Sequence, residues 1–149
     1  MKLTRASSYA LHAVACMAQQ KNVAKPVASH KIAEERGIPE RFLLKVLKPL
    51  VSARVLVSVK GPHGGYRLAR PASDINMLEI VEAVDGTIKG AVPPPDEWRG
   101  TGAVPRPLPR SMVAALTPLS NKLGGICRQS AEQTRKQLEK VKLSELLTK

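Results

Sequence analysis

The sequence predicts a mainly α-helical fold with one small β-hairpin. Apolar residues recur at helical spacing in five separate segments of the 149-residue chain. One β-branched run over residues 55–60 precedes a glycine-rich stretch, which is typical of a hairpin. Positive charge is concentrated in the first half, because residues 1–70 carry a net charge of +10 and residues 71–149 only +2. A surface with that excess of positive charge favours a polyanionic partner.

Two short helices are expected at the start of the chain. The first has one apolar side, formed by Tyr9, Ala10, Ala13, Val14 and Met17. A second helix is expected over residues 29–36, with Ser29 as its N-cap. Gly37 suits a left-handed helix end, and Pro39 suits the first position of a further helix.

That third helix, over residues 39–53, has two different sides. The side predicted to face the core holds Phe42, Leu43, Val46, Leu47 and Leu50. The opposite side holds Arg41, Lys45, Lys48 and Ser52, which recur at the spacing of helix turns. One side of this helix is therefore expected to be buried and the other to be basic and exposed.

A hairpin and a fourth helix complete the first domain, which we place at residues 1–86. The strands are expected over 55–60 and 66–69, and Arg54 occupies a helix exit where glycine would be the usual choice. At the start of the fourth helix Asn76 and Glu79 have the residue types of a capping box, and Gly86 is suited to the C-terminal end of that helix.

The rest of the chain is predicted to be a proline-rich linker or effector loop, residues 87–116, followed by a dimerisation helix and tail, residues 117–149. Six of the twelve prolines lie between residues 91 and 110. Thr117 and Pro118 resemble a helix start. The apolar stripe that follows has little domain to cover it, so we expect it to form a homodimer interface through Leu119, Leu123, Ile126, Cys127, Leu138 and Val141.

Helix, glycine turn, helix and hairpin is the order of a winged helix-turn-helix, which lays its second helix in the major groove of double-stranded DNA. We therefore expect contacts to DNA from the helices and from the hairpin. No helix follows the glycine pair of the hairpin directly, so a turn is favoured over a nucleotide-binding loop. The candidate DNA-binding residues are Ser29, Arg41, Lys45, Lys48, Lys60, His63, Gly64 and Arg67.

Several segments together resemble the Rrf2-type transcriptional regulators, the family that includes IscR, NsrR and CymR. They are residues 3–18 (LTRASSYALHAVACMA), Ile32-Ala33-Glu34, the hairpin segment 60–70 (KGPHGGYRLAR), residues 74–86 and residues 138–147 (LEKVKLSELL). The resemblance implies a homodimer that represses by binding an inverted-repeat operator. It also implies, for many members, a [2Fe-2S] cluster held by three cysteines after the fourth helix.

This chain has no cysteine between residues 87 and 110. Its two cysteines, Cys16 and Cys127, lie far apart in sequence and match no ligand position implied by the resemblance. We therefore expect a member that lacks the cluster cysteines, with no metal site and no cofactor. The alternatives are a redox or cluster-sensing regulator that uses Cys127 or Cys16, and an interaction module controlled by a protein partner.

Other functions find less support in the sequence. Three histidines, two distant cysteines and no clustered carboxylates make no catalytic set, so no enzyme is expected. His12 and Ser8 are read as an exposed polar face, and no membrane span or signal peptide is expected, which favours a cytoplasmic protein. A small-molecule or protein effector is expected near the proline-rich segment, where Trp98 could either anchor the loop or line a pocket.

Overall fold

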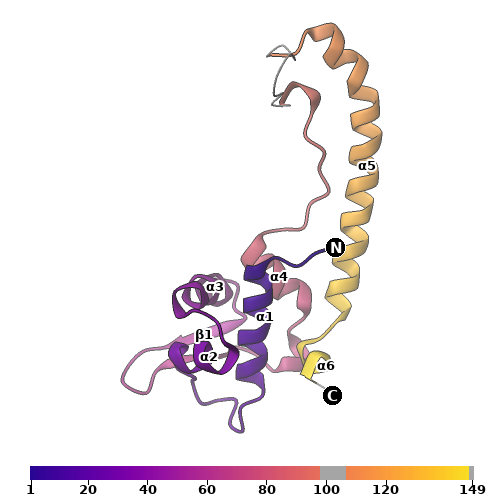
Figure 1. Cartoon of the computed structure of the whole chain (residues 1–149). Coiled ribbons are helices and arrows are strands. Elements are labelled where there is room, and N and C mark those ends of the chain that lie inside the picture. Colours follow the sequence, from indigo (N-terminus) through magenta and orange to yellow (C-terminus); the bar gives the residue numbers. More distant parts are fainter. Residues whose placement is uncertain (98–106, 148–149) are drawn as a thin grey trace. The chain divides into compact units, whose positions relative to one another are not determined.

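A computed structural model describes residues 1–97 and 107–147 of the chain (Figure 1). The chain divides into two compact units. Unit 1 comprises Met1–Thr87 together with the C-terminal segment from Lys136, and unit 2 comprises Ile88–Arg135. The mainly helical architecture with a single hairpin agrees with the fold class predicted from the sequence.

Unit 1 is built from helices around one apolar core. The core contains side chains from several helices, among them Met17, Ile32, Leu43, Leu47 and Ile80. The predicted inward side of the first helix is confirmed, because Ala10, Ala13 and Val14 are fully buried. The helices are α1 (Arg5–Ala18), α2 (Ser29–Arg36), α3 (Glu40–Ser52), α4 (Met77–Asp85) and the short α6 (Leu143–Leu147).

The turn between α2 and α3 follows the predicted geometry. Gly37 has a φ of 62°, a left-handed conformation that glycine adopts without the steric cost of a Cβ. The next residue, Ile38, is buried, and its N–H donates to the carbonyl of Ala33 at 2.9 Å. The two helices are thereby held at a fixed turn, as a helix-turn-helix requires.

Three residue assignments made from the sequence for α2 and α3 are wrong. Pro39, predicted as the first residue of the third helix, is its N-cap, and α3 begins at Glu40. Ser29 is the first residue of α2 and not its N-cap; Ala28 takes that position without a side-chain hydrogen bond. The Ser29 hydroxyl instead donates to Oε1 of Glu40 at 2.8 Å, because the helix-turn-helix brings the starts of α2 and α3 together. Phe42 is not a core residue: it lies at the edge of the apolar stripe of α3 and is 38% exposed.

The hairpin is an antiparallel pair, β1 (Leu56–Val59) and β2 (Gly65–Leu68), with Leu56 opposite Leu68 and Val59 opposite Gly65. The segment before α2 pairs with β2 through one antiparallel bridge, in which Val27 and Tyr66 exchange backbone hydrogen bonds of 2.9 and 2.8 Å. A Cβ on Gly65 would lie 2.2 Å from the carbonyl oxygen of Val27. This close approach requires glycine and ties the hairpin to the start of α2.

The connections on either side of the hairpin also match their sequence signals. Arg54 enters β1 with a φ of 59°, the left-handed conformation expected where glycine would be usual. At the start of α4 the side chain of Asn76 accepts from the N–H of Glu79 at 2.9 Å and donates to its carboxylate at 2.9 Å. Asn76 is therefore confirmed as the N-cap of α4, whereas Glu79 accepts from the Asn76 side chain and not from its backbone N–H as in a complete capping box.

The C-terminal segment returns to unit 1 and completes its core. The N–H of Leu143 donates to the carbonyl of Ile75 at 2.8 Å, and the N–H of Met77 donates to that of Val141 at 2.9 Å. Leu138 and Leu143 are 7% and 0% exposed. Part of the stripe predicted to face a partner copy is thus already buried within its own chain.

Unit 2 contains the segment after α4, a 3₁₀ turn η2 (Pro95–Glu97) and most of α5 (Arg110–Lys140). The predicted helix start at Thr117 is wrong. The carbonyl of Pro109 accepts from the N–H groups of Met112 and Val113 at 2.9 and 3.0 Å, so the helix begins earlier and Pro118 lies inside it. Hydrogen-bonded turns on both sides of Pro118 keep the long helix continuous despite the missing N–H. Trp98 lies outside the described residues.

Candidate nucleic-acid interface

The basic face of α3, which we define as Arg41, Lys45 and Lys48, is exposed to solvent. The helix is strongly two-sided: Leu43, Leu47 and Leu50 on its other side are fully buried. Burial of that side fixes the rotation of the helix about its axis, so the three cations must point outward. An exposed row of cations on the second helix of a helix-turn-helix is suited to bind a DNA groove.

Phe42 lies among these cations. The guanidinium carbon of Arg41 lies 4.6 Å from the ring centroid of Phe42, and Nζ of Lys45 lies 5.7 Å from it. Cations over an aromatic face are attracted to its quadrupole, which restricts two long and otherwise mobile side chains. Sequence reasoning assigned Phe42 to the core and so missed its place in this surface; its position at the edge of the apolar stripe was the available signal.

The hairpin presents the other predicted contacts. Lys60 and His63 are exposed, Gly64 closes the hairpin loop through an N–H that donates to the carbonyl of Gly61 at 3.0 Å, and Arg67 is half-buried. Nη1 of Arg67 donates to the carbonyl of Leu68 at 3.3 Å. Lys60 and His63 are thus free to reach a ligand from the loop, whereas Arg67 lies along the strand.

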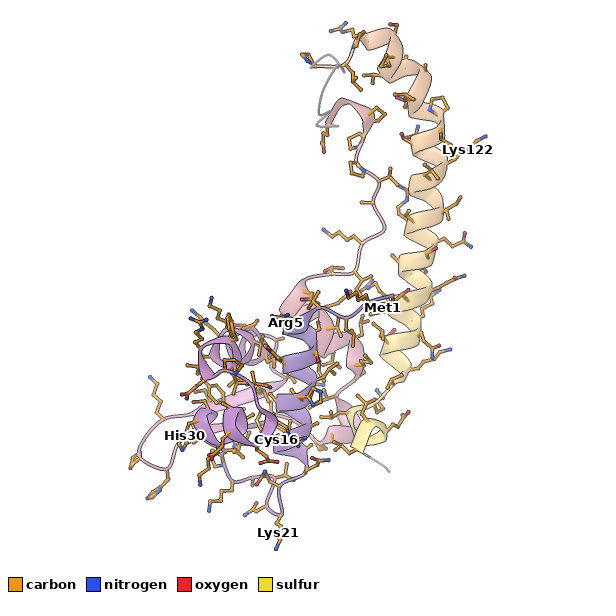
Figure 2. The ribbon with its side chains drawn as sticks, in the orientation of Figure 1. Met1, Arg5, Cys16, Lys21, His30 and Lys122 are labelled. Atoms are coloured by element: carbon orange, nitrogen blue, oxygen red, sulfur yellow. The ribbon has the colours of Figure 1, made fainter. Side chains whose placement is uncertain are left out.

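A shallow hollow joins the hairpin loop to the beginning of α2. It is lined by Pro62, His63 and Gly64 from the hairpin and by residues on the other side that include Lys25, His30 and Lys31. Figure 2 labels His30 on α2. The charge of the first half of the chain predicted a basic surface, but only the tertiary structure brings His63 together with Lys25, His30 and Lys31. The sequence analysis selected His63 and not the other three.

The apolar seam of α5, defined as Leu119, Leu123 and Ile126, is exposed. These side chains are 59%, 42% and 61% accessible in the single chain. Cys127 beside them is half-buried. The other two predicted interface residues lie in unit 1, where Leu138 is buried and Val141 follows the end of α5.

The described helices include none long and apolar enough to cross a membrane. Within the same residues no group of three or more His, Cys, Asp or Glu side chains is arranged to hold a metal ion.

Comparison with known proteins identifies the family to which this chain belongs. A family model named Rrf2, described as an iron-dependent transcriptional regulator, matches residues 3–149. Protein aau3 of Rhizobium meliloti is 35% identical over 86 residues, which cover 57% of this chain and 54% of that protein. The transcriptional regulator IscR of Vibrio atlanticus is 38% identical over 88 residues, covering 59% and 50%. The chain therefore matches about half the length of these curated relatives.

Solved structures resemble nearly the whole chain. The structure of CymR, the global cysteine regulator of B. subtilis, has a TM-score of 0.65 and 18% identity, and covers 99% of this chain and 96% of its own. T. potens IscR has a TM-score of 0.64 and 21% identity, and covers 99% and 86%. At these identities the likeness establishes the fold, and the predicted fold class is confirmed.

The cysteines of this chain do not fit an iron-sulfur cluster. A [2Fe-2S] cluster takes four protein ligands, which are mostly thiolates. The chain has two cysteines. Cys16 is fully buried in the core of unit 1 and Cys127 lies on α5 in unit 2. Burial raises the pKa of the Cys16 thiol, an effect that a hydrogen bond to Arg36 only partly opposes, so the thiolate needed for ligation is disfavoured.

Proposed function

Because the chain belongs to the Rrf2 family of transcriptional regulators, we propose that it is a dimeric repressor that binds an inverted-repeat operator without an iron-sulfur cluster. The observation that carries this proposal is the exposed basic face of α3 on a helix whose rotation the core fixes. The family and the IscR relative named above are transcriptional regulators and not enzymes, in agreement with the absence of a catalytic set in the sequence.

In the proposed complex α3 enters the major groove. Arg41 and Lys45 lie in the first turns of α3, the end that contacts base edges in helix-turn-helix proteins. Arg41 is suited to a bidentate contact with guanine, and the exposed ring of Phe42 beside it is suited to the methyl group of thymine. Lys48 lies further along the helix, where it would meet a phosphate.

The hairpin and the start of α2 supply backbone contacts in this proposal. Lys60 and His63 on the loop, together with Lys25 and Lys31 in the adjoining hollow, form a basic surface that suits a phosphate backbone. The proposed interface also includes Ser29 at the start of α2, Gly64 in the hairpin loop and Arg67 on β2.

The apolar seam of α5 is the proposed dimer contact. Leu119, Leu123 and Ile126 recur at helical spacing and are exposed in the single chain, so pairing with a second copy would remove them from water. Cys127 lies at the border of the seam as a small apolar side chain. A two-fold dimer matches an operator with two half-sites.

A gel-shift competition tests the proposal. The labelled probe is the promoter of the protein's own gene, and the competitors are an inverted repeat found in it by footprinting and a scrambled duplex of equal length and composition. We expect the inverted repeat to compete at least about 10³-fold better than the scrambled duplex. Equal competition would indicate a protein that coats DNA without reading its sequence.

The cluster-free state needs a separate measurement. Anaerobic reconstitution with iron and sulfide should leave a colourless protein, and oxidant should leave its operator affinity unchanged. A stoichiometric visible chromophore that disappears in Cys127→Ser would instead support the redox-sensing alternative.

A further inference from the structure

Unit 2 contains a hollow of about 430 Å³ between the segment 90–95 and one side of α5. Its walls are apolar on the segment side, where Val92 and Pro94 contribute, and polar on the helix side, where Ser120, Asn121 and Arg128 contribute. We propose that this hollow binds a small organic monocarboxylate with an apolar body, and that the acid is the effector of the regulator. The effector role rests on the proposed function; the binding site does not.

The presence of Gly124 in α5 is explained by a hollow at this position. Gly124 and Gly125 are adjacent in the interior of a helix, where each glycine costs about 1 kcal/mol relative to alanine. A Cβ on Gly124 would lie 3.2 Å from Nη1 of Arg128. The missing side chain therefore leaves room for the Arg128 guanidinium to lie back along the helix beside the hollow.

The opposite wall is held directly against the helix backbone. A Cβ on Gly90 would lie 1.9 Å from the carbonyl oxygen of Cys127, so the segment at residue 90 can pack on α5 only as glycine. Beyond this contact Val92 and Pro94 line the hollow from the segment side and Ser120 and Asn121 line it from α5. The contact between Gly90 and the backbone of Cys127 therefore fixes one end of the hollow.

The charge at the hollow selects the ligand. Arg128 forms no ion pair with any residue that the structure describes, and the lining residues whose side chains are described include no acidic one. One guanidinium matches one carboxylate, in a geometry that permits two parallel hydrogen bonds. A phosphate dianion would leave a charge uncompensated, and its hydrated oxygens would face Val92, Pro94 and Val113. A branched or unbranched aliphatic acid fits these walls better.

This site and the proposed dimer contact use different sides of α5. Thr117, Ser120, Asn121, Gly124 and Arg128 recur at the spacing of one helix face and line the hollow. The apolar seam of Leu119, Leu123 and Ile126 lies on the other side, and none of its residues lines the hollow. A second copy could therefore cover the seam and leave the hollow open.

The test titrates the full-length protein with sodium 4-methylpentanoate, followed by amide chemical shifts and calorimetry. We expect saturable binding with shifts centred on residues 90–95 and 117–128. The neutral 4-methylpentanamide and inorganic phosphate should each bind at least 10-fold more weakly. Absence of saturable binding, or equal binding of phosphate or of the amide, would overturn the proposed ligand class while leaving operator binding untouched.

Three variants locate the site. Arg128→Gln removes the charge and should weaken binding at least 10-fold, and Gly124→Leu fills the hollow and should abolish binding with helix content retained by circular dichroism. Lys122→Gln is the matched control, because Lys122 is an exposed cation of the same helix that does not line the hollow (Figure 2). Equal loss in Lys122→Gln and Arg128→Gln would place binding elsewhere.

The effector role is measured on operator DNA. Saturating acid should change the apparent Kd for the inverted repeat at least fivefold in the unmodified protein and leave Arg128→Gln unchanged. Binding of the acid without any change in operator affinity would remove the regulatory role. Failure of the protein to bind the operator at all would contradict the proposed function and not the site.

Discussion

At the scale of single residues, Arg41, Phe42 and Lys45 form one small exposed assembly on α3. The ring restricts the two cations before any ligand arrives, since both lie within 6 Å of its centroid. Side chains that are already ordered lose less entropy on binding. Phe42 would therefore contribute both its own contact and the orientation of its neighbours.

Arg41→Ala should cost about 1–3 kcal/mol in operator affinity if Arg41 makes a bidentate base contact. The loss should be confined to the correct sequence, so the ratio of operator to scrambled affinity should fall. Quantitative gel shifts with both duplexes provide the measurement, and Lys122→Ala on α5 is the control. An unchanged ratio would reduce Arg41 to a phosphate contact.

Cys16 should be protected from alkylation in the folded protein. It is fully buried, and burial raises the pKa of its thiol, so the reactive thiolate is scarce at pH 8. Iodoacetamide followed by peptide mass spectrometry should label Cys127 in the native protein and Cys16 only in denaturant. Native labelling of Cys16 at the rate of free glutathione would show that the core opens readily at α1.

At the scale of elements, α5 has two faces with different proposed partners. Its apolar seam is exposed to water in the single chain. A helix with such an apolar face gains stability when another surface packs against that face. The end of the helix differs, because Leu138 is buried in unit 1. Removing the whole C-terminal segment would therefore damage the core, so the dimer is better tested by single substitutions.

Ile126→Glu should convert dimers into monomers. The substitution places a charge in the middle of the proposed contact, where desolvation without a partner is costly. Sedimentation equilibrium measures the mass, and Gln129→Glu, which adds the same charge at an exposed position outside the seam, is the control. A dimer that survives Ile126→Glu would exclude the seam as its contact.

At the scale of the whole molecule, the asymmetry of charge is the dominant feature. The excess of +10 within the first 70 residues belongs to the domain that carries the helix-turn-helix and the hairpin. Such a field attracts nucleic acid over distances of a Debye length and falls with added salt.

Operator affinity should accordingly fall steeply with salt concentration. If a dimer neutralises about six to ten phosphates, the logarithm of the binding constant should fall by roughly 0.9 per phosphate for each tenfold rise in salt. Fluorescence anisotropy at four salt concentrations gives the slope. A slope near zero would reject the basic first half as the DNA surface. Lys60→Gln removes one phosphate contact from each subunit of the dimer and should reduce the slope by about 1.8.

Periodicity and charge in the sequence by themselves determined the order of the elements, the turn at Gly37, the N-cap at Asn76 and the basic character of the first domain. These features depend on residues a few positions apart, so the local pattern is sufficient. The resemblance of scattered segments to one family also held over residues 3–149.

Only the tertiary structure decided which surfaces are free. Phe42 and Leu138 are both apolar members of a helical stripe, yet the first is exposed and the second is buried, because burial at the edge of a stripe depends on what packs there from distant parts of the chain. The same holds for the basic hollow of Lys25, His30 and His63, and for the approach of Gly90 to Cys127. Periodicity records which face of a helix is apolar, whereas contacts between residues far apart in sequence determine whether that face is covered.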